Sequence, residues 1–313
     1  MKGAGRFAFL ALILAALGAG AWLATRGTAP DRRDLDAFVT VGGDVVRDAL
    51  HPAIDLTRMS PAQETGLGAE IDAQIRSGMA VGADPATEAY LEGVLDLVAA
   101  HVDRPGLSYR IAVVRTVEIN AFAVAGGRIY ITDGMLKTVR SEAELAAVLG
   151  HEVSHVDLRH CVERLQLERA ARRIDPGLAA LARLGYEIAL LGFSEEQELA
   201  ADARGALFAA QASYDPWSLN EMFLRLPPAV PRRPTRNPLE EVALAIPEAL
   251  RRYVETHPPV DQRIETVRRA LVARPDLWLG ARRYVGRANF AARRTLADDP
   301  RESEWQVRRQ PPP

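Results

Sequence analysis

The sequence predicts a mainly helical α+β fold that contains a small sheet and is preceded by one apolar N-terminal helix. Apolar residues recur at helical spacing over most of the chain, whereas only short segments show the alternation of strands. With 313 residues, of which 48% are hydrophobic and 26% charged, the chain is long enough for one sizeable folded domain. The net charge of -2 gives no basic surface for nucleic acid, so no nucleic-acid partner is expected.

Residues 1–27 are predicted to be a signal peptide or a transmembrane anchor. Lys2 and Arg6 precede an apolar run from Phe7 to Ala24, which reaches the roughly 18 residues that a spanning helix needs. A basic N-terminus stays in the cytoplasm and sends the following chain across the membrane, so contact with a membrane is expected through this segment. Small residues near the end of the run leave open whether it is cleaved. Residues 28–59 then read as a tether.

Two helices and a hairpin are expected in the next part of the chain. A helix begins at Ser60-Pro61 and runs to Gly78, and a second opens at Asp84-Pro85. Strands are predicted at Ser108–Val114 and Arg128–Thr132. The intervening stretch Asn120–Gly127 ends in two glycines, which is a turn signal that suits a hairpin.

A strongly apolar helix is predicted to begin at Ser141. Glu144 follows three residues later, and this spacing predicts a capping box. The apolar residues lie on most sides of this helix, which indicates that it is buried.

The rest of the chain is expected to be helical with one long loop. Helices are predicted at 176–193 and 194–212, and the proline-rich segment 227–238 reads as a surface loop. The main domain is expected to end near residue 270. Residues 271–313 would then form a helical extension and a tail.

His151, Glu152 and His155 are the strongest chemical signal in the sequence. Residues four apart share a helix face, so two imidazoles can approach one metal ion together. Glu152 lies about 100 degrees around the helix from His151, within reach of a water molecule at that metal. Zinc would lower the pKa of the water while the carboxylate takes its proton. The alternative is a surface helix with two solvated histidines, but burying these side chains without a purpose would be costly.

A catalytic zinc needs a third protein ligand and an open position. Glu198 and Asp202, four apart on a predicted helix, offer one carboxylate for the metal and one for the second N–H of a ligating histidine. Alone, these residues would read as the solvated acidic start of a helix. Together with the upstream motif they predict one Zn²⁺ per chain, although other divalent ions could occupy such a site.

Four motifs in this order resemble the type I CAAX prenyl protease family of zinc metallopeptidases, to which HtpX and BepA belong. They are an Asn-Ala-Phe-Ala stretch before two glycines, the two-histidine motif with a following Arg-His, the helix with the third ligand, and His-Pro followed by Arg. In this sequence they are Asn120–Gly127, His151–His155 with Arg159-His160, Ser194–Gly205 and His257–Arg263. Glu195 and Ala200 depart from the family pattern, which puts the ion pairs around the site in doubt.

The resemblance implies a gluzincin metallopeptidase domain over residues 60–270, with Glu152 as general base. It implies that the edge of the small sheet binds an extended peptide through Asn120, Ala121, Phe122, Ala123, Gly126 and Gly127. His257 or Arg263 would steady the oxyanion, unless His257 occupies the open zinc position at rest or only caps a helix. His160 would be structural or would support a ligand.

The implied function is a zinc metalloendopeptidase that hydrolyses unfolded or misassembled envelope proteins in the periplasm of a bacterial cell. An alternative is a periplasmic chaperone or assembly factor that binds extended polypeptide with little cleavage. The intact Glu152 argues against that alternative, because a binding module needs no general base. A non-proteolytic zinc hydrolase would not need the peptide-binding edge. The natural substrate, the regulation of the site and the oligomeric state stay open.

Overall fold

The structure is a computed structural model that describes residues 59–163, 193–225 and 258–311. All of these residues belong to one compact unit, which comprises Met59–Leu165 and Tyr186–Pro313. In this part of the chain, no helix is both long enough and apolar enough to cross a membrane. Several predicted features lie outside the described residues, namely the segment 1–27, the tether up to Arg58, the helix 176–193 except Phe193, the loop 227–238, and His257.

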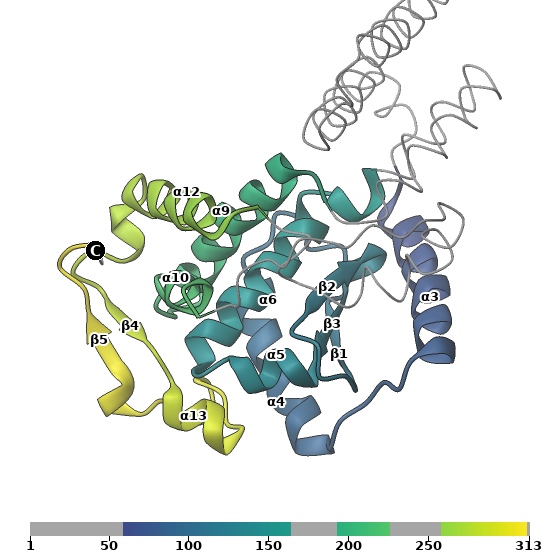
Figure 1. Cartoon of the computed structure of the whole chain (residues 1–313), viewed down its shortest axis with the longest axis horizontal. Coiled ribbons are helices and arrows are strands. Elements are labelled where there is room, and N and C mark those ends of the chain that lie inside the picture. Colours follow the sequence, from purple (N-terminus) through teal and green to yellow (C-terminus); the bar gives the residue numbers. More distant parts are fainter. Residues whose placement is uncertain (1–58, 164–192, 226–257, 312–313) are drawn as a thin grey trace, which may run out of the picture. The chain divides into compact units, whose positions relative to one another are not determined.

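The predicted class, mainly helical α+β with a small sheet, is confirmed (Figure 1). The helices are α3 (Pro61–Gly78), α4 (Pro85–Ala99), α5 (Asp133–Thr138), α6 (Glu142–Asp157), α9 (Glu195–Gln211), α10 (Ser218–Phe223), α12 (Val260–Val272) and α13 (Arg287–Ala292). The strands are β1 (Arg110–Val114), β2 (Ala121–Val124), β3 (Arg128–Thr132), β4 (Arg282–Tyr284) and β5 (Trp305–Val307).

The first three strands form one sheet in the order β1-β3-β2, in which β1 is parallel and β2 antiparallel to β3. The predicted hairpin is present, and its turn holds Gly126 and Gly127 at φ values of 77° and 80°. Glycine populates this left-handed region without a Cβ penalty. The outer edge of β1 is covered by the chain at Ala80–Gly82, which exchanges backbone hydrogen bonds with Val113 and Arg115. Among the described strands, none pairs with the outer edge of β2.

Helix α6 is the centre of the described unit, and each of its residues is buried. It contacts β2, α4, α9 and α10 (Figure 1). Ser141 caps the helix by accepting the N–H of Glu144, as the sequence predicts. The second half of the predicted capping box is different, because the Glu144 carboxylate accepts the N–H of Arg140 at 2.9 Å and also pairs with Arg225.

The C-terminal segment 274–311 differs from the helical extension that the sequence predicts. It contains α13 together with a two-stranded antiparallel sheet of β4 and β5. The carbonyl groups of Val285 and Gly286 accept the N–H groups of Ala143 and Glu142 at 3.0 Å and 3.1 Å. Because first-turn N–H groups have no partner within their own helix, this segment completes the N-terminus of α6.

Candidate metal centre

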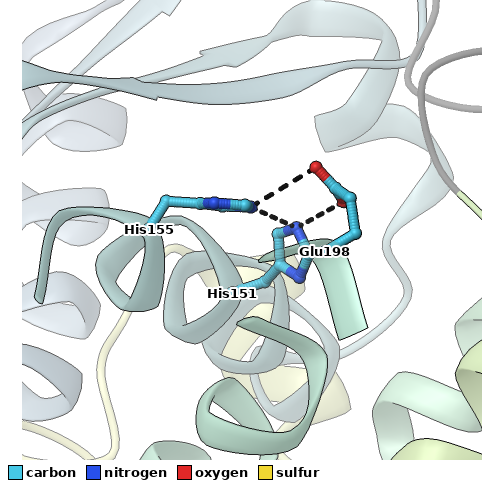
Figure 2. Close-up of side chains that lie close together, drawn as sticks. All are labelled: His151, His155 and Glu198. Carbon is cyan, nitrogen blue, oxygen red and sulfur yellow. Dashed lines mark hydrogen bonds and ion pairs between the residues drawn. The ribbon is translucent and has the colours of Figure 1, made fainter. Parts of the chain in front are cut away.

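His151, His155 and Glu198 bring their donor atoms together between α6 and α9. The Nε2 atoms of the two imidazoles lie 3.1 Å apart, and the Glu198 carboxylate lies 3.4 Å from His151 and 3.6 Å from His155. Figure 2 shows the two rings and the carboxylate directed toward one another. All three are buried, and their ligand atoms lie within 4.8 Å of one another. Two imidazoles and one carboxylate are a donor set that fits a catalytic zinc, and such burial would be costly without a cation.

Asp202 and Arg263 extend the arrangement behind His151. Asp202 Oδ1 lies 2.8 Å from Nδ1 of His151. Arg263 donates hydrogen bonds to both oxygens of the same carboxylate, from Nε at 2.7 Å and from Nη2 at 2.6 Å. Burial alone would raise the pKa of Asp202, but Arg263 and His151 hold it below its usual value. The ionised Asp202 therefore accepts the proton on Nδ1 and leaves Nε2 of His151 for a metal.

His160 contacts the second histidine through the turn that ends α6. Arg159 adopts a left-handed φ of 67° and donates its N–H to Val156 at 3.0 Å, as in a Schellman motif. In that motif the next residue lies against the residue three positions before the cap, and here these residues are His160 and His155. Their Nδ1 atoms lie 3.0 Å apart. Burial lowers the pKa of His160 to about 4, so its ring is neutral and can accept the Nδ1 proton of His155.

Glu152 lies beside the ligands with only 2% of its surface exposed. The backbone N–H of Ala123 in β2 lies near its carboxylate and favours the charged form. Burial raises the pKa of Glu152 to about 7, and the neighbouring Glu198 also raises it, whereas His151 opposes the shift. A carboxylate with a pKa near neutrality can both take and return a proton.

Strand β2 presents part of its backbone toward the site. The carbonyl of Asn120 accepts the N–H of Thr132 at 3.0 Å. Because hydrogen-bonded and non-hydrogen-bonded pairs alternate in an antiparallel ladder, the backbone groups of Ala121 and Ala123 point away from β3. Phe122 stacks on Tyr130 with ring centroids 4.9 Å apart. Gly126 and Gly127 lie at the hairpin turn rather than on the outward edge.

Arg263 is buried against Asp202, whereas a side chain that contacts the oxyanion would have to reach the open side of the site. Only 1% of its surface is exposed, and its guanidinium lies over the ring of Phe223 at 4.1 Å from the centroid. The bidentate pair with Asp202 directs it to the far side of His151. His257 lies outside the described residues, so its predicted role stays a prediction.

Two contacts of the site were not anticipated from the sequence. The ring of Phe193 stacks on His155 with centroids 3.7 Å apart and planes 15° apart. Phe193 precedes the helix cap Ser194, which is a position that often holds an apolar residue, but this does not reveal its partner. The other is the approach of the Ala123 backbone N–H to Glu152, and residue type carries no signal for a backbone group.

Comparisons with known proteins agree with this geometry. Residues 85–271, more than half of the chain, match Peptidase family M48. The chain is similar to the "Mitochondrial metalloendopeptidase OMA1" of Schizosaccharomyces pombe, with 31% identity over 148 residues, 45% of this chain and 44% of that protein. The protein of that name from Arabidopsis thaliana is 29% identical over 195 residues, 58% of this chain and 36% of that protein.

A bacterial relative belongs to the same group. The "Beta-barrel assembly-enhancing protease" of Escherichia coli K12 is 25% identical over 179 residues, 51% of this chain and 37% of that protein. The chain thus spans less than half the length of these relatives. The family match covers the helix with both histidines and the helix with Glu198, and it confirms the resemblance inferred from the motifs. The chain therefore belongs to Peptidase family M48.

Proposed function

We propose that this chain is a zinc metalloendopeptidase in which Glu152 is the general base. The approach of the Ala123 backbone N–H in β2 to the Glu152 carboxylate, beside His151 and Glu198, is the observation that carries this proposal. It places a buried carboxylate between the candidate ligands on α6 and the outer edge of β2, with which no other described strand pairs. A site that holds only a structural metal has no need of a base beside an open strand edge.

The chain's own residues account for most of the proposed chemistry. His151, His155 and Glu198 would hold the zinc, which supplies Lewis acidity that polarises a carbonyl and lowers the pKa of water. Glu152 takes a proton from the attacking water as its oxygen bonds to the carbonyl carbon. The same carboxyl group then gives that proton to the nitrogen of the departing amine as the C–N bond breaks.

The substrate of this proposed enzyme is an extended polypeptide. Ala121 and Ala123 direct backbone groups outward. The Ala123 N–H approaches Glu152 and its carbonyl accepts the Cys161 thiol at 3.7 Å, so a peptide strand would pair by β-augmentation beside them, with the groups of Ala121. Asn120 and Phe122 would hold this edge in register, and Gly126 and Gly127 would shape its turn. Such recognition reads main chain more than side chains, so unfolded or misassembled proteins are the preferred class.

We assign Arg263 a positioning role in place of the oxyanion contact suggested by the resemblance. It neutralises and orients Asp202, which in turn holds His151. His257 stays the candidate for the oxyanion contact or for the open zinc position.

The bacterial cell envelope is the proposed compartment. The basic and apolar segment 1–27 supports delivery to or across a membrane. The relatives named beta-barrel assembly-enhancing protease support the bacterial setting, whereas those named OMA1 are mitochondrial. Fractionation of cells with an antibody to the full chain tests this assignment, which a purely cytoplasmic pool would contradict.

A cleavage assay tests the proposed activity. The full chain is incubated with one substrate protein in its unfolded and its folded form, with and without a zinc chelator, and the products are identified by mass spectrometry. We expect internal cleavage of the unfolded form, abolished by the chelator. Stable binding without products, at one zinc per chain, would instead support the chaperone alternative.

A further inference from the structure

Helices α6 and α9 touch each other backbone to backbone at a pair of buried glycines. A Cβ atom added to Gly205 would lie 2.5 Å from the backbone nitrogen of His151. One added to Gly150 would lie 2.7 Å from the carbonyl oxygen of Gly205. Real Cβ atoms essentially never approach other atoms so closely, so neither position accepts a side chain without movement of a helix.

This contact lies at the metal centre. Gly150 directly precedes His151, and the backbone of His151 is itself part of the contact. Gly205 follows Asp202 by three residues and Glu198 by seven, so all three share one face of α9. The distances of 3.4 Å from Glu198 and 2.8 Å from Asp202 to His151 therefore depend on how closely α9 approaches α6.

The intrinsic preferences of the two helices work against these glycines. Glycine inside a helix costs about 1 kcal/mol relative to alanine. Alanine at 205 would require the 2.5 Å contact to open to an ordinary 3.4 Å, a displacement of about 1 Å. Metal–ligand distances tolerate only about 0.2 Å. A shift of α9 by about 1 Å could therefore leave the chain folded and still move Glu198 out of bonding distance of the metal.

We propose that Gly150 and Gly205 are positioning residues of the metal centre, because their missing Cβ atoms bring Glu198 and Asp202 within reach of His151. This inference rests on the proposed zinc site. The same contact fixes the distances of both carboxylates, Glu198 and Asp202, from the imidazole of His151. Glycine is required here for distance, since neither residue has a positive φ.

The test compares zinc binding in Gly205→Ala and Gly150→Ala with that of the wild-type full chain. Zinc affinity is measured by competition with a chelating dye, and the absorption spectrum of the cobalt-substituted chain reports the ligand geometry. We expect zinc affinity to fall at least about tenfold in Gly205→Ala, with a changed cobalt spectrum. Gly150→Ala should change both in the same direction.

Two matched controls separate positioning from general packing. A Cβ at Gly93 in α4 would lie 2.7 Å from the Thr295 methyl group, which is a clash at a similar distance, but with the side chain of a residue that is not a ligand. Gly66 in α3 has nothing within 4 Å of the added Cβ. Gly93→Ala should lower the melting temperature without changing zinc affinity, and Gly66→Ala should change neither by much.

Each other outcome overturns the inference in a recognisable way. If both glycine variants fold and bind zinc like the wild type, the glycines do not position the ligands, and the proposed function stands. If neither variant folds even in saturating zinc, the glycines serve the stability of the whole unit. A wild-type chain that binds no zinc overturns the proposed function together with the inference.

Discussion

Glu142 and Glu152 are two buried glutamates on the same helix, about 15 Å apart along its axis at 1.5 Å per residue. Burial raises the pKa of each to about 7. Their exposure is also nearly the same, at 0% and 2%. Neither burial nor pKa therefore separates a structural carboxyl group from a catalytic one.

Their neighbours separate them. The Glu142 carboxylate accepts the Tyr214 hydroxyl and the Leu296 N–H, both at 2.6 Å. Leu296 ties the start of α6 to the C-terminal segment, and Tyr214 ties it to the chain that follows α9. Glu152 instead lies beside His151 and Glu198, with one backbone N–H, that of Ala123, near its carboxylate. A perturbed pKa identifies a candidate site only when metal ligands and an open approach accompany it.

Removing the C-terminal segment, which supplies the Leu296 N–H to Glu142, should have the largest effect. Truncation after Ala273 deletes the carbonyl groups that complete α6 and three buried aromatic side chains, Trp278, Tyr284 and Phe290. At roughly 1.5–3 kcal/mol each, these side chains alone approach the whole stability of a typical domain, about 5–15 kcal/mol. We expect loss of cooperative unfolding in circular dichroism and rapid proteolysis. A truncated chain that unfolds cooperatively and binds zinc would show that the segment is dispensable.

Exchanging each glutamate for glutamine should affect the cleavage rate very differently at the two positions. Glu152→Gln keeps the shape but removes the base, so cleavage should slow by about 10²- to 10⁴-fold while zinc stays bound. Glu142→Gln is the matched control and should stay within about threefold of the wild-type rate. Initial rates at saturating substrate measure both. Equal losses in the two variants would mean that Glu152 has no special role.

The pH dependence of stability should report Glu142. Its pKa is about 7 in the folded chain against its usual value of 4.5, so the folded state binds more protons between these values. The stabilisation is therefore complete below about pH 4.5 and is lost as the pH rises through about 7. Between pH 5 and pH 8, the free energy of unfolding measured in urea should fall by about 2–3 kcal/mol more in the wild type than in Glu142→Gln. Parallel curves for the two chains would exclude this contribution.

The smallest effect is expected from Asp202→Asn, which removes one charge from behind His151. Zinc affinity should fall about 10- to 100-fold, as for other changes to a partner of a ligating histidine. Asp215→Asn is the matched control, because Asp215 is also buried and paired with an arginine, Arg308, but contacts the C-terminal strands instead. Dye competition measures both affinities. Equal affinities in Asp202→Asn and the wild type would remove Asp202 from the metal centre.

Local signals made much of the fold predictable. Ser60, Asp84 and Ser194 each cap the helix that the sequence placed after them, because a cap depends only on the next three residues. The pairing of His151 with His155 is equally local, since four residues make one helical turn. Glu198 lies about forty residues further on, and it was predictable as the third donor only because the upstream two-histidine motif requires one.

Contacts between distant segments were not predictable in the same way. Arg263 meets Asp202 across 61 positions, and nothing in either segment shows which face of α12 turns inward. Strands β4 and β5 have three residues each, which is too short for a clear alternation. The approach of α9 to α6 depends on Gly150 and Gly205, and a helical pattern shows only that they are weak helix formers.

The central claim is that His151, His155 and Glu198 hold one catalytic zinc. It is tested most directly by measuring cleavage of an unfolded protein while zinc is added to the metal-free chain. We predict that activity rises in proportion to bound zinc, levels off at one zinc per chain, and stays absent in Glu198→Ala. Full activity of the metal-free chain, or an undiminished response to zinc in Glu198→Ala, would contradict the account.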